Sequence, residues 1–387
     1  MRFIPKALKL APLAATVALA FSASGALAQE VLKIGLTAPL SGGAALYGKN
    51  VLNGLNLAAK EINAQGLTVA GKKYKVEIVA LDDKYSPAEA SINARRLKQQ
   101  HETAVIYVPH SGGAFALQTF NQQENFLLMA YTSVPTITEK GNKLTMRIPP
   151  NFMTYIEPFI RYEMKKGKKL GMAPADHDYA KAWVAAFEPA WIKAGGTVVS
   201  KNPMSYNKSA DFYTGVSRVL ETKPDVMFIG GPSEPTGLVA KQARELGFKG
   251  GFLVMDQAKL DEMARVVGGL EVLEGAIGVL PVSADPSPDN QAFIARFGQK
   301  FAGRVPGSEA LWNYTAVHAT AKAMQLAGSA TDAKAIHAKL DAGYKALSPQ
   351  VNPGGVLGVD DKGGTLTRER GGAVQDGKIT VISTEKK

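Results

Sequence analysis

Apolar and polar positions along the chain predict strands that are each followed by a polar turn and a helix. Residues 104–108 (AVIYV) form a short β-branched and aromatic run, typical of a strand buried in a parallel sheet. A polar segment at 109–113 (PHSGG) follows and opens a helix. A second apolar strand at 126–130 brings residues 131–134 to the same sheet edge, because the C-terminal ends of parallel strands lie side by side. Two polar loops therefore face one crevice.

The first of these loops has the composition of an anion site. Gly112 and Gly113 let the backbone bend closely round a guest. Ser111 adds a hydroxyl where the first unpaired N–H groups of the helix point outward, so a carboxylate would fit there. The alternative is that both loops are ordinary strand-to-helix connections that carry turn residues.

The alternation of strand and helix continues on the N-terminal side of this stretch. Strands are predicted at 31–37 and 74–81. An amphipathic helix between them shows apolar residues at helical spacing: Val51, Leu55, Ala58, Ala59 and Ile62. A helix start follows at Ser86, Pro87 and Glu89, which have the spacing of a capping box with proline in the first turn. Repeated units of this kind require right-handed crossovers, and hence a parallel sheet with helices on both faces.

The same pattern restarts after Pro150. Further strands are predicted at 168–173, 197–200, 226–230, 251–255 and 275–280. Helices are predicted between them at 180–194, 211–221 and up to 246, and again polar residues such as Asp256 follow the strands. A proline-rich link then leads to helices at 290–301 and 309–326, which are assigned to the first lobe, and the tail at 354–384 predicts small closing strands.

Length and composition fit this arrangement of two lobes. A chain of 387 residues is too long for one typical core, since a domain holds ~150 residues. With 45% hydrophobic and 20% charged residues, the composition is that of an ordinary soluble protein, which argues against disorder.

The first 28 residues predict a secretory signal peptide. Arg2, Lys6 and Lys9 precede an apolar run, and residues 26–28 (ALA) form a small-residue cleavage signal. The alternative, a membrane anchor, is less favoured because this apolar run is short and no other stretch approaches ~20 apolar residues. The chain has no cysteine, so it has no lipid attachment point of the bacterial lipoprotein type. We therefore expect a free periplasmic protein.

The chain is basic, and a basic protein could bind nucleic acid or a membrane surface. The formal net charge is +11, and +8 remains once the three basic residues of the first 28 are removed. The densest basic run, residues 161–169 (RYEMKKGKK), is typical of the solvated end of a helix before a strand. Export also argues against a nucleic-acid partner.

Motifs for common chemistry are missing from the sequence. It contains no Walker A loop, no GxGxxG opening a helix after a strand, no GxSxG, no HExxH and no cysteine-based metal pattern. His177 lies between Asp176 and Asp178, but no second ligand-rich segment supports a metal, so a turn or cap role is favoured. His110 and Ser111 are adjacent, and adjacent residues rarely form a base and nucleophile pair. We expect no catalytic residues, metal or cofactor; a hydrolase remains the enzyme alternative.

Several segments together carry a family resemblance. The order of KIGLTAPLSGGAALYG (33–48), NGLNLAAKEINAQG (53–66), ALDDKYSPAEA (80–90), HSGG (110–113) and MAYTSVPTIT (129–138) resembles the leucine-type family of periplasmic solute-binding proteins, the receptors of branched-chain amino acid ABC transporters. The resemblance covers essentially the whole chain after the signal. It implies the type I periplasmic binding protein fold, with two doubly wound flavodoxin-like α/β lobes that close over a ligand.

The resemblance also implies lobe boundaries and hinge crossings near 147, 281 and 356. The first lobe would comprise 29–147 and 282–355, and the second lobe 148–281 and 356–387.

A ligand site follows from the same resemblance. The Ser111 hydroxyl would hold a ligand carboxylate, helped by the backbone N–H groups of residues 132–134. Tyr47 and Tyr179 would form aromatic walls in the two lobes, with core packing as their alternative role, and Asp256 would hold the α-amino group. The predicted ligand-binding residues are Ser111, Thr132, Ser133, Val134, Tyr47, Tyr179 and Asp256.

The sequence departs from the family pattern at three places. The family's disulfide between the regions of Tyr85 and His110 cannot form without cysteine. Pro232 replaces an aromatic expected after Gly231, and Asp256 is one methylene shorter than the usual glutamate. The shorter acid and the missing ring would leave room for a bulkier or different guest. The expected ligand is therefore a branched-chain or related amino acid, and an aromatic acid, another small carboxylate or a short amide is the second candidate.

The expected role is capture by hinge closure and delivery to an inner-membrane ABC permease, by a protein that acts as a monomer. A ligand-sensing regulatory domain is the alternative from another class, since the same fold serves in sensors.

Overall fold

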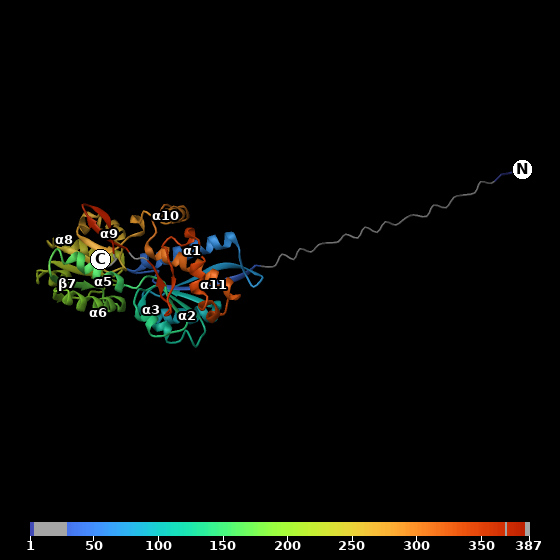
Figure 1. Ribbon diagram of the computed structural model, residues 1–387, viewed down its shortest axis with the longest axis horizontal. Coiled ribbons are helices and arrows are strands. Elements are labelled where there is room, and N and C mark those ends of the chain that lie inside the picture. Colours follow the sequence, from blue (N-terminus) through green and yellow to red (C-terminus); the bar gives the residue numbers. More distant parts are fainter. Residues whose placement is uncertain (4–28, 368–369, 384–387) are drawn as a thin grey trace.

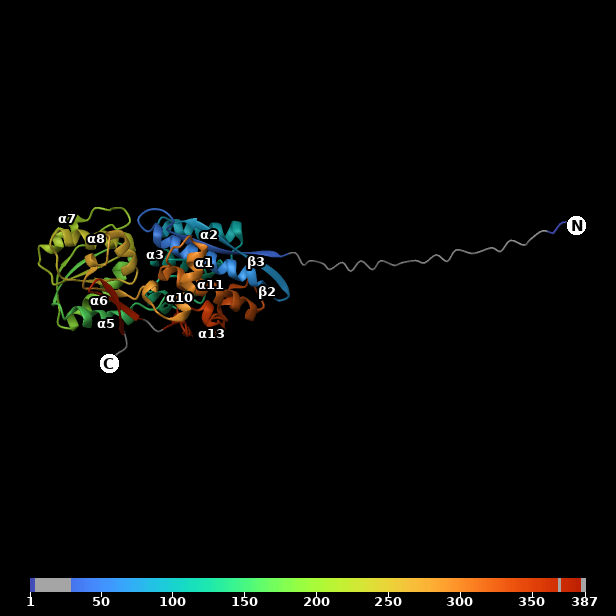
Figure 2. The same ribbon diagram turned by 90° about the horizontal axis from the view of Figure 1, so that it is seen from above.

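Two β-sheets, each packed between helices, form two bodies that lie side by side in the computed structural model (Figures 1 and 2). The structure describes residues 1–3, 29–367 and 370–383. Most of the predicted signal peptide therefore lies outside the described residues. No helix in the described part of the chain combines the length and apolar character needed to cross a membrane.

The first sheet has six strands in the order β2-β3-β1-β4-β5-β6. Its strands are β1 (Glu30–Ala38), β2 (Leu67–Val69), β3 (Lys72–Asp82), β4 (Val105–Val108), β5 (Leu127–Ala130) and β6 (Thr145–Arg147). All neighbours pair in parallel except β2, which forms a hairpin with β3. The central strands β4 and β5 are buried throughout, as expected of apolar strands covered on both faces.

Helices from both ends of the chain cover the first sheet. They are α1 (Ala45–Gln65), α2 (Pro87–His101), α3 (Ser111–Gln118), α4 (Thr136–Glu139), α10 (Pro288–Lys300), α11 (Ser308–Ala327), α12 (Ala333–His337) and α13 (Leu340–Lys345), with a 3₁₀ turn, η3 (Pro349–Val351). One hydrophobic cluster joins α1 and β1 to α10 and α11, so residues after 282 complete the first core. This body is the first lobe.

The second sheet has seven strands in the order β15-β14-β11-β10-β9-β7-β8. Its strands are β7 (Lys169–Pro174), β8 (Thr197–Lys201), β9 (Val226–Gly230), β10 (Gly251–Val254), β11 (Ala276–Val279), β14 (Arg370–Gln375) and β15 (Lys378–Ser383). The first five are parallel, and the hairpin β14–β15 adds antiparallel strands at the β11 edge. The predicted closing strands of the tail are thus present.

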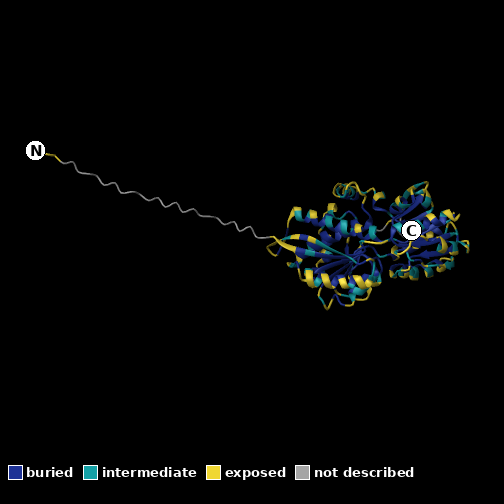
Figure 3. Cartoon of the chain, turned by 180° about the vertical axis from the view of Figure 1, so that it is seen from behind, coloured by how far each residue is buried: buried dark blue, intermediate teal, exposed yellow. Residues whose placement is uncertain are grey.

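Five helices and one 3₁₀ turn accompany the second sheet within the described residues. They are α5 (Met153–Glu163), α6 (Asp178–Lys193), α7 (Tyr213–Leu220), α8 (Ser233–Glu245), α9 (Leu260–Val267) and η1 (Glu271–Leu273). A further 3₁₀ turn, η2 (Val282–Ala284), follows β11, and its Val282 belongs to the first core. Large aromatic side chains such as Trp183, Phe187 and Trp191 of α6 are fully buried here. Figure 3 shows that buried residues fill both sheets, while exposed residues lie on the outer helices and turns. This body is the second lobe.

The strand order fixes where a site can form. In each lobe the parallel strands follow the flavodoxin order. The second parallel strand, β3 in the first lobe and β8 in the second, lies on the outer side of the first parallel strand, β1 or β7. The order reverses between β1 and β4 in the first lobe and between β7 and β9 in the second. Ligands of open α/β sheets bind at such reversal points, outside the carboxyl ends of the strands.

Three segments connect the lobes. The first follows β6 and the second follows β11, close to the predicted positions. The short strands β12 (Gly358–Val359) and β13 (Thr365–Leu366) pair with each other, and the Val359 N–H donates to Asp341 of α13 in the first lobe. The chain therefore returns to the second lobe after β13.

The predicted α/β fold with two doubly wound lobes is confirmed, and the predicted strands and long helices are present. The capping box at Ser86 is also present, since its side chain accepts from the Glu89 N–H at 3.4 Å. The predicted loop at 109–113 is shorter than expected, because α3 begins at Ser111. Helices α12 and α13 were not predicted; with five and six residues they are too short to show helical periodicity.

Candidate functional site

Polar loops from both lobes meet at a small cavity between the two reversal points. Ser111 of the first lobe and Asp256 of the second both line it, so the two residues share one cavity, as the proposed site requires. Its lining includes six of the seven predicted residues: Tyr47, Ser111, Thr132, Ser133, Tyr179 and Asp256. The seventh, Val134, is buried in the core next to it.

The first-lobe side of the cavity carries two paired hydroxyls. Ser111 Oγ and Thr132 Oγ1 lie 2.6 Å apart, and both side chains are buried. Ser111 is the first residue of α3, whose first-turn N–H groups have no partner within the helix. Within the described part of the chain, the N–H groups of Thr132 and Ser133 also bond no protein acceptor. Such a cluster of hydroxyls and free N–H groups suits a carboxylate.

The histidine before Ser111 fixes the start of α3. His110 Nδ1 accepts a hydrogen bond from the Gly113 N–H at 3.0 Å, so the other ring nitrogen carries the proton and faces Asp83 Oδ2 at 3.1 Å. The Asp83 carboxylate is fully buried and also accepts from Thr37 Oγ1 at 2.9 Å. His110 is therefore a helix cap held in place by a buried acid, which orients Ser111 toward the cavity.

Gly112 and Gly113 are explained by neighbouring atoms that lie too close for a side chain, and not by a bend of the backbone. A Cβ on Gly113 would lie 2.6 Å from the His110 ring, so only glycine fits beneath the capping histidine. A Cβ on Gly112 would lie 2.8 Å from Pro87 and 3.2 Å from Asp178 of the second lobe. Gly112 thus permits close contact between α3 and α6.

Tyrosine rings form much of the cavity wall. Tyr47 and Tyr131 pack together with ring centroids 6.0 Å apart on the first-lobe side. Tyr85 also lines the cavity and stacks on His110 at 4.8 Å. This stacked pair joins the two segments that a disulfide would link in the family pattern. Burial raises the pKa of Tyr47, Tyr85 and Tyr131, so these rings are neutral and offer flat apolar area with a polar tip.

The Asp256 carboxylate is held between the lobes. Ser133 Oγ of the first lobe donates to Asp256 Oδ2 at 2.5 Å, and Trp183 Nε1 donates to Oδ1 at 3.0 Å. The Tyr179 hydroxyl also donates to Oδ1. Burial raises the pKa of Asp256 to about 6, while the bond from Ser133 and the charge of Lys259 act in the opposite direction.

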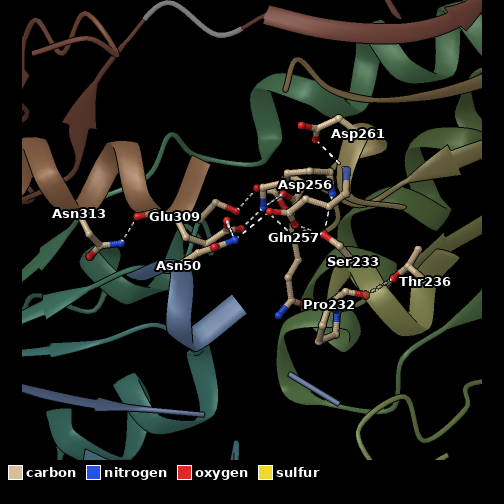
Figure 4. Close-up of polar contacts among 12 residues, drawn as sticks. Asn50, Pro232, Ser233, Thr236, Asp256, Gln257, Asp261, Glu309 and Asn313 are labelled. Atoms are coloured by element: carbon tan, nitrogen blue, oxygen red, sulfur yellow. Dashed lines mark hydrogen bonds and ion pairs between the residues drawn. The ribbon is translucent and has the colours of Figure 1, made fainter. Parts of the chain in front are cut away.

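A buried polar network next to Asp256 also joins the lobes. Figure 4 shows Asn50 and Glu309 of the first lobe reaching toward residues of the second. The Asn50 side-chain amide donates to Glu262 Oε1 at 2.8 Å, and the Lys259 ammonium forms an ion pair with Glu309. Ser233 Oγ donates to the other oxygen of Glu262 at 2.6 Å. We call these five residues the interlobe network.

The interlobe network has more acid than base. Lys259 faces two carboxylates, Glu309 and Glu262, all of them buried. Burial and the charge of Glu309 raise the pKa of Glu262 above its ordinary value. Lys259 Nζ additionally donates to the backbone oxygens of Asp256 at 3.0 Å and Gln257 at 2.7 Å, which ties the network to the cavity wall.

A second cavity adjoins the first and is partly open to solvent. The two share Tyr131, Pro149 and Asp256. Its walls combine apolar residues such as Pro150, Leu280 and Trp312 with polar ones, which are Asp285, Asn290, Ser308 and Arg370. The proposed ligand site therefore continues into a larger, partly open hollow of mixed character.

Reasoning from the sequence missed Gln257, Lys259 and Glu309. Gln257 and Lys259 follow the same strand exit as Asp256, and that position could have signalled them. Glu309 lies at the start of α11, where an acid is ordinary. The predicted cap role of His177 is confirmed, because its Nδ1 accepts from the Ala180 N–H at 3.2 Å. Burial lowers the pKa of His177 to about 4, so this cap is neutral.

The predicted solvation of the basic run is also confirmed, with Arg161, Lys165 and Lys168 all exposed. No cluster of three or more potential metal ligands occurs among the residues that the structure describes.

A family model and a relative of known type both match most of this chain. Residues 31–376 match the family model described as periplasmic binding protein. A Leu/Ile/Val-binding protein of Rhizobium johnstonii is 28% identical over 321 residues, which cover 82% of this chain and 85% of the relative.

Solved structures share the fold. A leucine-binding protein from Thermotoga maritima superposes with a TM-score of 0.75 at 23% identity, covering 91% of this chain and 99% of the other. A solute-binding protein of an ABC transporter from Rhodopseudomonas palustris, solved in complex with 3,4-dihydroxybenzoic acid, gives a TM-score of 0.73 at 24% identity, covering 92% and 98%.

Proposed function

The chain belongs to the periplasmic binding protein family, of the branched-chain amino acid ABC transporter type, and we propose that it captures a small carboxylate-bearing ligand between its lobes. The observation that carries this proposal is the meeting of Ser111, Thr132 and Asp256 at one cavity. The predicted family resemblance is confirmed by the family match.

In the proposed mechanism, the first lobe binds the ligand before the lobes close. One hydroxyl of the Ser111–Thr132 pair donates to its partner, and the other hydroxyl and the free N–H groups at 132–133 donate to the ligand carboxylate. Hydrogen bonds to a charged acceptor are about twice as strong as neutral ones, so this end of the ligand is held first. Val134 keeps the same proposed role through its backbone N–H.

Closure then brings the second lobe over the ligand. Tyr179 and Asp256 complete the cavity, and contacts such as Ser133 to Asp256 and the interlobe network form between the lobes. A ligand that touches both lobes stabilises the closed form by its differential affinity for that form. An inner-membrane permease would recognise the closed form and receive the ligand.

A branched-chain or related amino acid is the first proposed ligand. Its carboxylate would lie at Ser111, and its ammonium would lie near the Asp256 carboxylate, which is the arrangement that the family implies. The names of relatives such as the Rhizobium protein support this choice.

An aromatic acid is the second candidate. The Asp256 carboxylate already accepts hydrogen bonds from Ser133, Tyr179 and Trp183, which lowers its capacity for an ammonium. The tyrosine walls and the adjoining cavity suit a flat ring, and the Rhodopseudomonas protein with this fold was solved with such an acid.

We further propose lobe boundaries close to those expected from the sequence. The first lobe comprises 29–147 and 282–366, and the second lobe 148–281 and the segment after β13, because β12 and β13 pack on α13. Relatives of this type act in the periplasm, and we propose the same location for this chain, as a monomer without catalytic activity.

The proposed function is tested by a thermal-shift screen of the chain from residue 29 against amino acids, aromatic acids and short amides. A ligand at 100 times its dissociation constant adds ~2.7 kcal/mol to stability, which a thermal shift detects readily. Binding confirmed by calorimetry, with intact ligand recovered stoichiometrically, supports the proposal. Turnover of the bound compound would point instead to an enzyme.

A further inference from the structure

Gln257 is a residue of the cavity wall to which neither the sequence nor the family gives a role. It directly follows Asp256 at the carboxyl end of β10 and lines the same cavity as Ser111. Only 4% of the residue is exposed. Its function bears on which ligand the cavity accepts, and the inference below rests on the proposed function.

Gln257 is held at one point on its side chain and one point on its backbone. Its Nε2 donates to the Tyr85 hydroxyl of the first lobe at 2.7 Å, and Tyr85 is in turn stacked on His110. The Gln257 backbone oxygen accepts from Lys259 Nζ at 2.7 Å. A side chain fixed in this way is preorganised, so it contacts a guest without a large loss of conformational entropy.

The oxygen of the Gln257 side-chain amide differs from its nitrogen in its contacts. Gln257 Oε1 is buried and bonds no partner among the residues that the structure describes. A buried acceptor without a partner costs ~1–3 kcal/mol, and such groups are rare in native proteins. The cost disappears when a guest in the cavity supplies a donor.

The donors of two neighbouring side chains are directed elsewhere. Lys259 Nζ donates to two backbone oxygens and forms an ion pair with Glu309. Trp183 Nε1 has one hydrogen, which is directed at Asp256 and Tyr179. A guest in the cavity that carries a donor supplies a partner for Gln257 Oε1 that these two side chains do not.

We propose that Gln257 selects ligands that carry an N–H or O–H donor in addition to the carboxylate. The carboxylate is held at Ser111 and Thr132, and the donor reaches the amide oxygen of Gln257 from the body of the ligand. Hydroxylated and amino-substituted acids belong to this class, whereas simple alkyl and aryl carboxylates leave the oxygen unpaired. A site with a buried polar group rejects analogues that lack the matching partner.

The test compares pairs of probes that differ in the donor alone. L-leucine is paired with 4-methylpentanoate, and 4-hydroxybenzoate with benzoate, and dissociation constants are measured by calorimetry for the wild-type chain and Gln257→Met. Methionine has a similar length and no amide. In the pair that binds, the wild type prefers the donor-bearing probe, and this preference falls at least 10-fold in Gln257→Met.

Two further variants serve as controls. Gln257→Glu keeps an acceptor at the same position and retains the preference for the donor-bearing probe. Gln375→Met removes a hydrogen bond of the same kind, from Gln375 to the Tyr162 hydroxyl at 3.0 Å, on the exposed edge of the second sheet, and changes neither dissociation constant. Thermal unfolding establishes that each variant is folded.

An equal loss of affinity for both members of a pair, or no loss at all, would overturn the role of Gln257. Failure of the proposed function looks different, because the wild-type chain then binds none of the four probes before any variant is compared.

Discussion

Ser133 Oγ lies 2.5 Å from Asp256 Oδ2, and this hydrogen bond joins the loop after β5 in the first lobe to the loop after β10 in the second. The two residues are 123 positions apart in the chain. Because each follows a parallel strand, the contact brings together the carboxyl ends of two different sheets. It therefore reports the closed arrangement of the lobes, and the buried carboxylate at its centre makes this arrangement sensitive to pH.

The pH dependence follows from the raised pKa of Asp256. Burial raises this pKa from an ordinary value of 3.8 to about 6, so the folded chain holds a proton that the unfolded chain has lost between these values. The contribution of Asp256 to the unfolding free energy therefore falls as pH rises through this window. Asp256→Asn removes this dependence. We expect its unfolding free energy relative to wild type to increase by up to ~3 kcal/mol between pH 3.5 and pH 7.

The measurement is denaturant unfolding of both proteins at a series of pH values without ligand. Parallel curves for wild type and Asp256→Asn across this range would show that Asp256 titrates normally and is not enclosed as described.

The Ser111 hydroxyl is predicted to bind the ligand carboxylate. Ser111→Ala removes one donor to a charged group and leaves Thr132 Oγ1 without its partner at 2.6 Å. We expect carboxylate binding to weaken by ~1–3 kcal/mol, measured by calorimetry with the strongest ligand of the screen. Ser91→Ala is the matched control, because Ser91 Oγ bonds the backbone of its own helix at Pro87 and does not line the cavity. Equal affinities of the two variants would remove Ser111 from the site.

The variant Gly43→Ala is predicted to hinder closure of the lobes, although Gly43 does not line the cavity. A Cβ at this position would lie 2.9 Å from the backbone oxygen of Tyr206, which belongs to the second lobe. Gly43→Ala therefore clashes only when the lobes are closed. We expect the affinity for ligand to fall about 10-fold, while the melting temperature without ligand changes little.

Calorimetry and thermal unfolding together check this separation. Gly298→Ala in α10 is the control, because the nearest atoms to a Cβ there are 3.7 Å away and all belong to the first lobe. An unchanged affinity of Gly43→Ala would indicate that ligand binding does not need the lobe contact at Tyr206.

The interlobe network is predicted to stabilise the closed form through Lys259. Lys259→Met removes the cation and leaves Glu309 and Glu262 buried close together without it. Loss of one partner of a buried ion pair costs ~3–5 kcal/mol, and here the cost applies to the closed form. We expect a loss of ligand affinity of at least 100-fold by calorimetry.

The double variant Lys259→Met with Glu309→Gln removes the uncompensated charge and should recover part of this affinity. A double variant no better than Lys259→Met alone would show that the pair is not coupled.

The sequence predicted the fold because its local signals agree with the tertiary structure. The run at 104–108 is β-branched and apolar throughout, and the structure buries it as β4. Ser111 and Asp256 each lie within three residues of a strand end, and strand ends of parallel sheets gather at one edge, which agrees with the site that the family resemblance implied.

Contacts that depend on how the lobes meet could not be predicted. Glu262 lies on α9 beside Asp261, where an acid is typical of an exposed first turn, yet Asn50 and Ser233 enclose it. The partner of Lys259 is Glu309, 50 residues further along the chain and in the other lobe. No local pattern encodes these pairs, because they depend on the angle between two separately folded bodies.

A ligand and its own amide differ in the group that Ser111 is proposed to hold between the closed lobes, so their affinities report directly on that contact. Calorimetry measures the wild-type chain with L-leucine and L-leucinamide and with benzoate and benzamide. We expect that, in the pair that binds, replacing the carboxylate by the neutral amide weakens binding at least 10-fold, and that Ser111→Ala reduces this difference. Equal affinity for acid and amide in the wild-type chain would contradict this expectation.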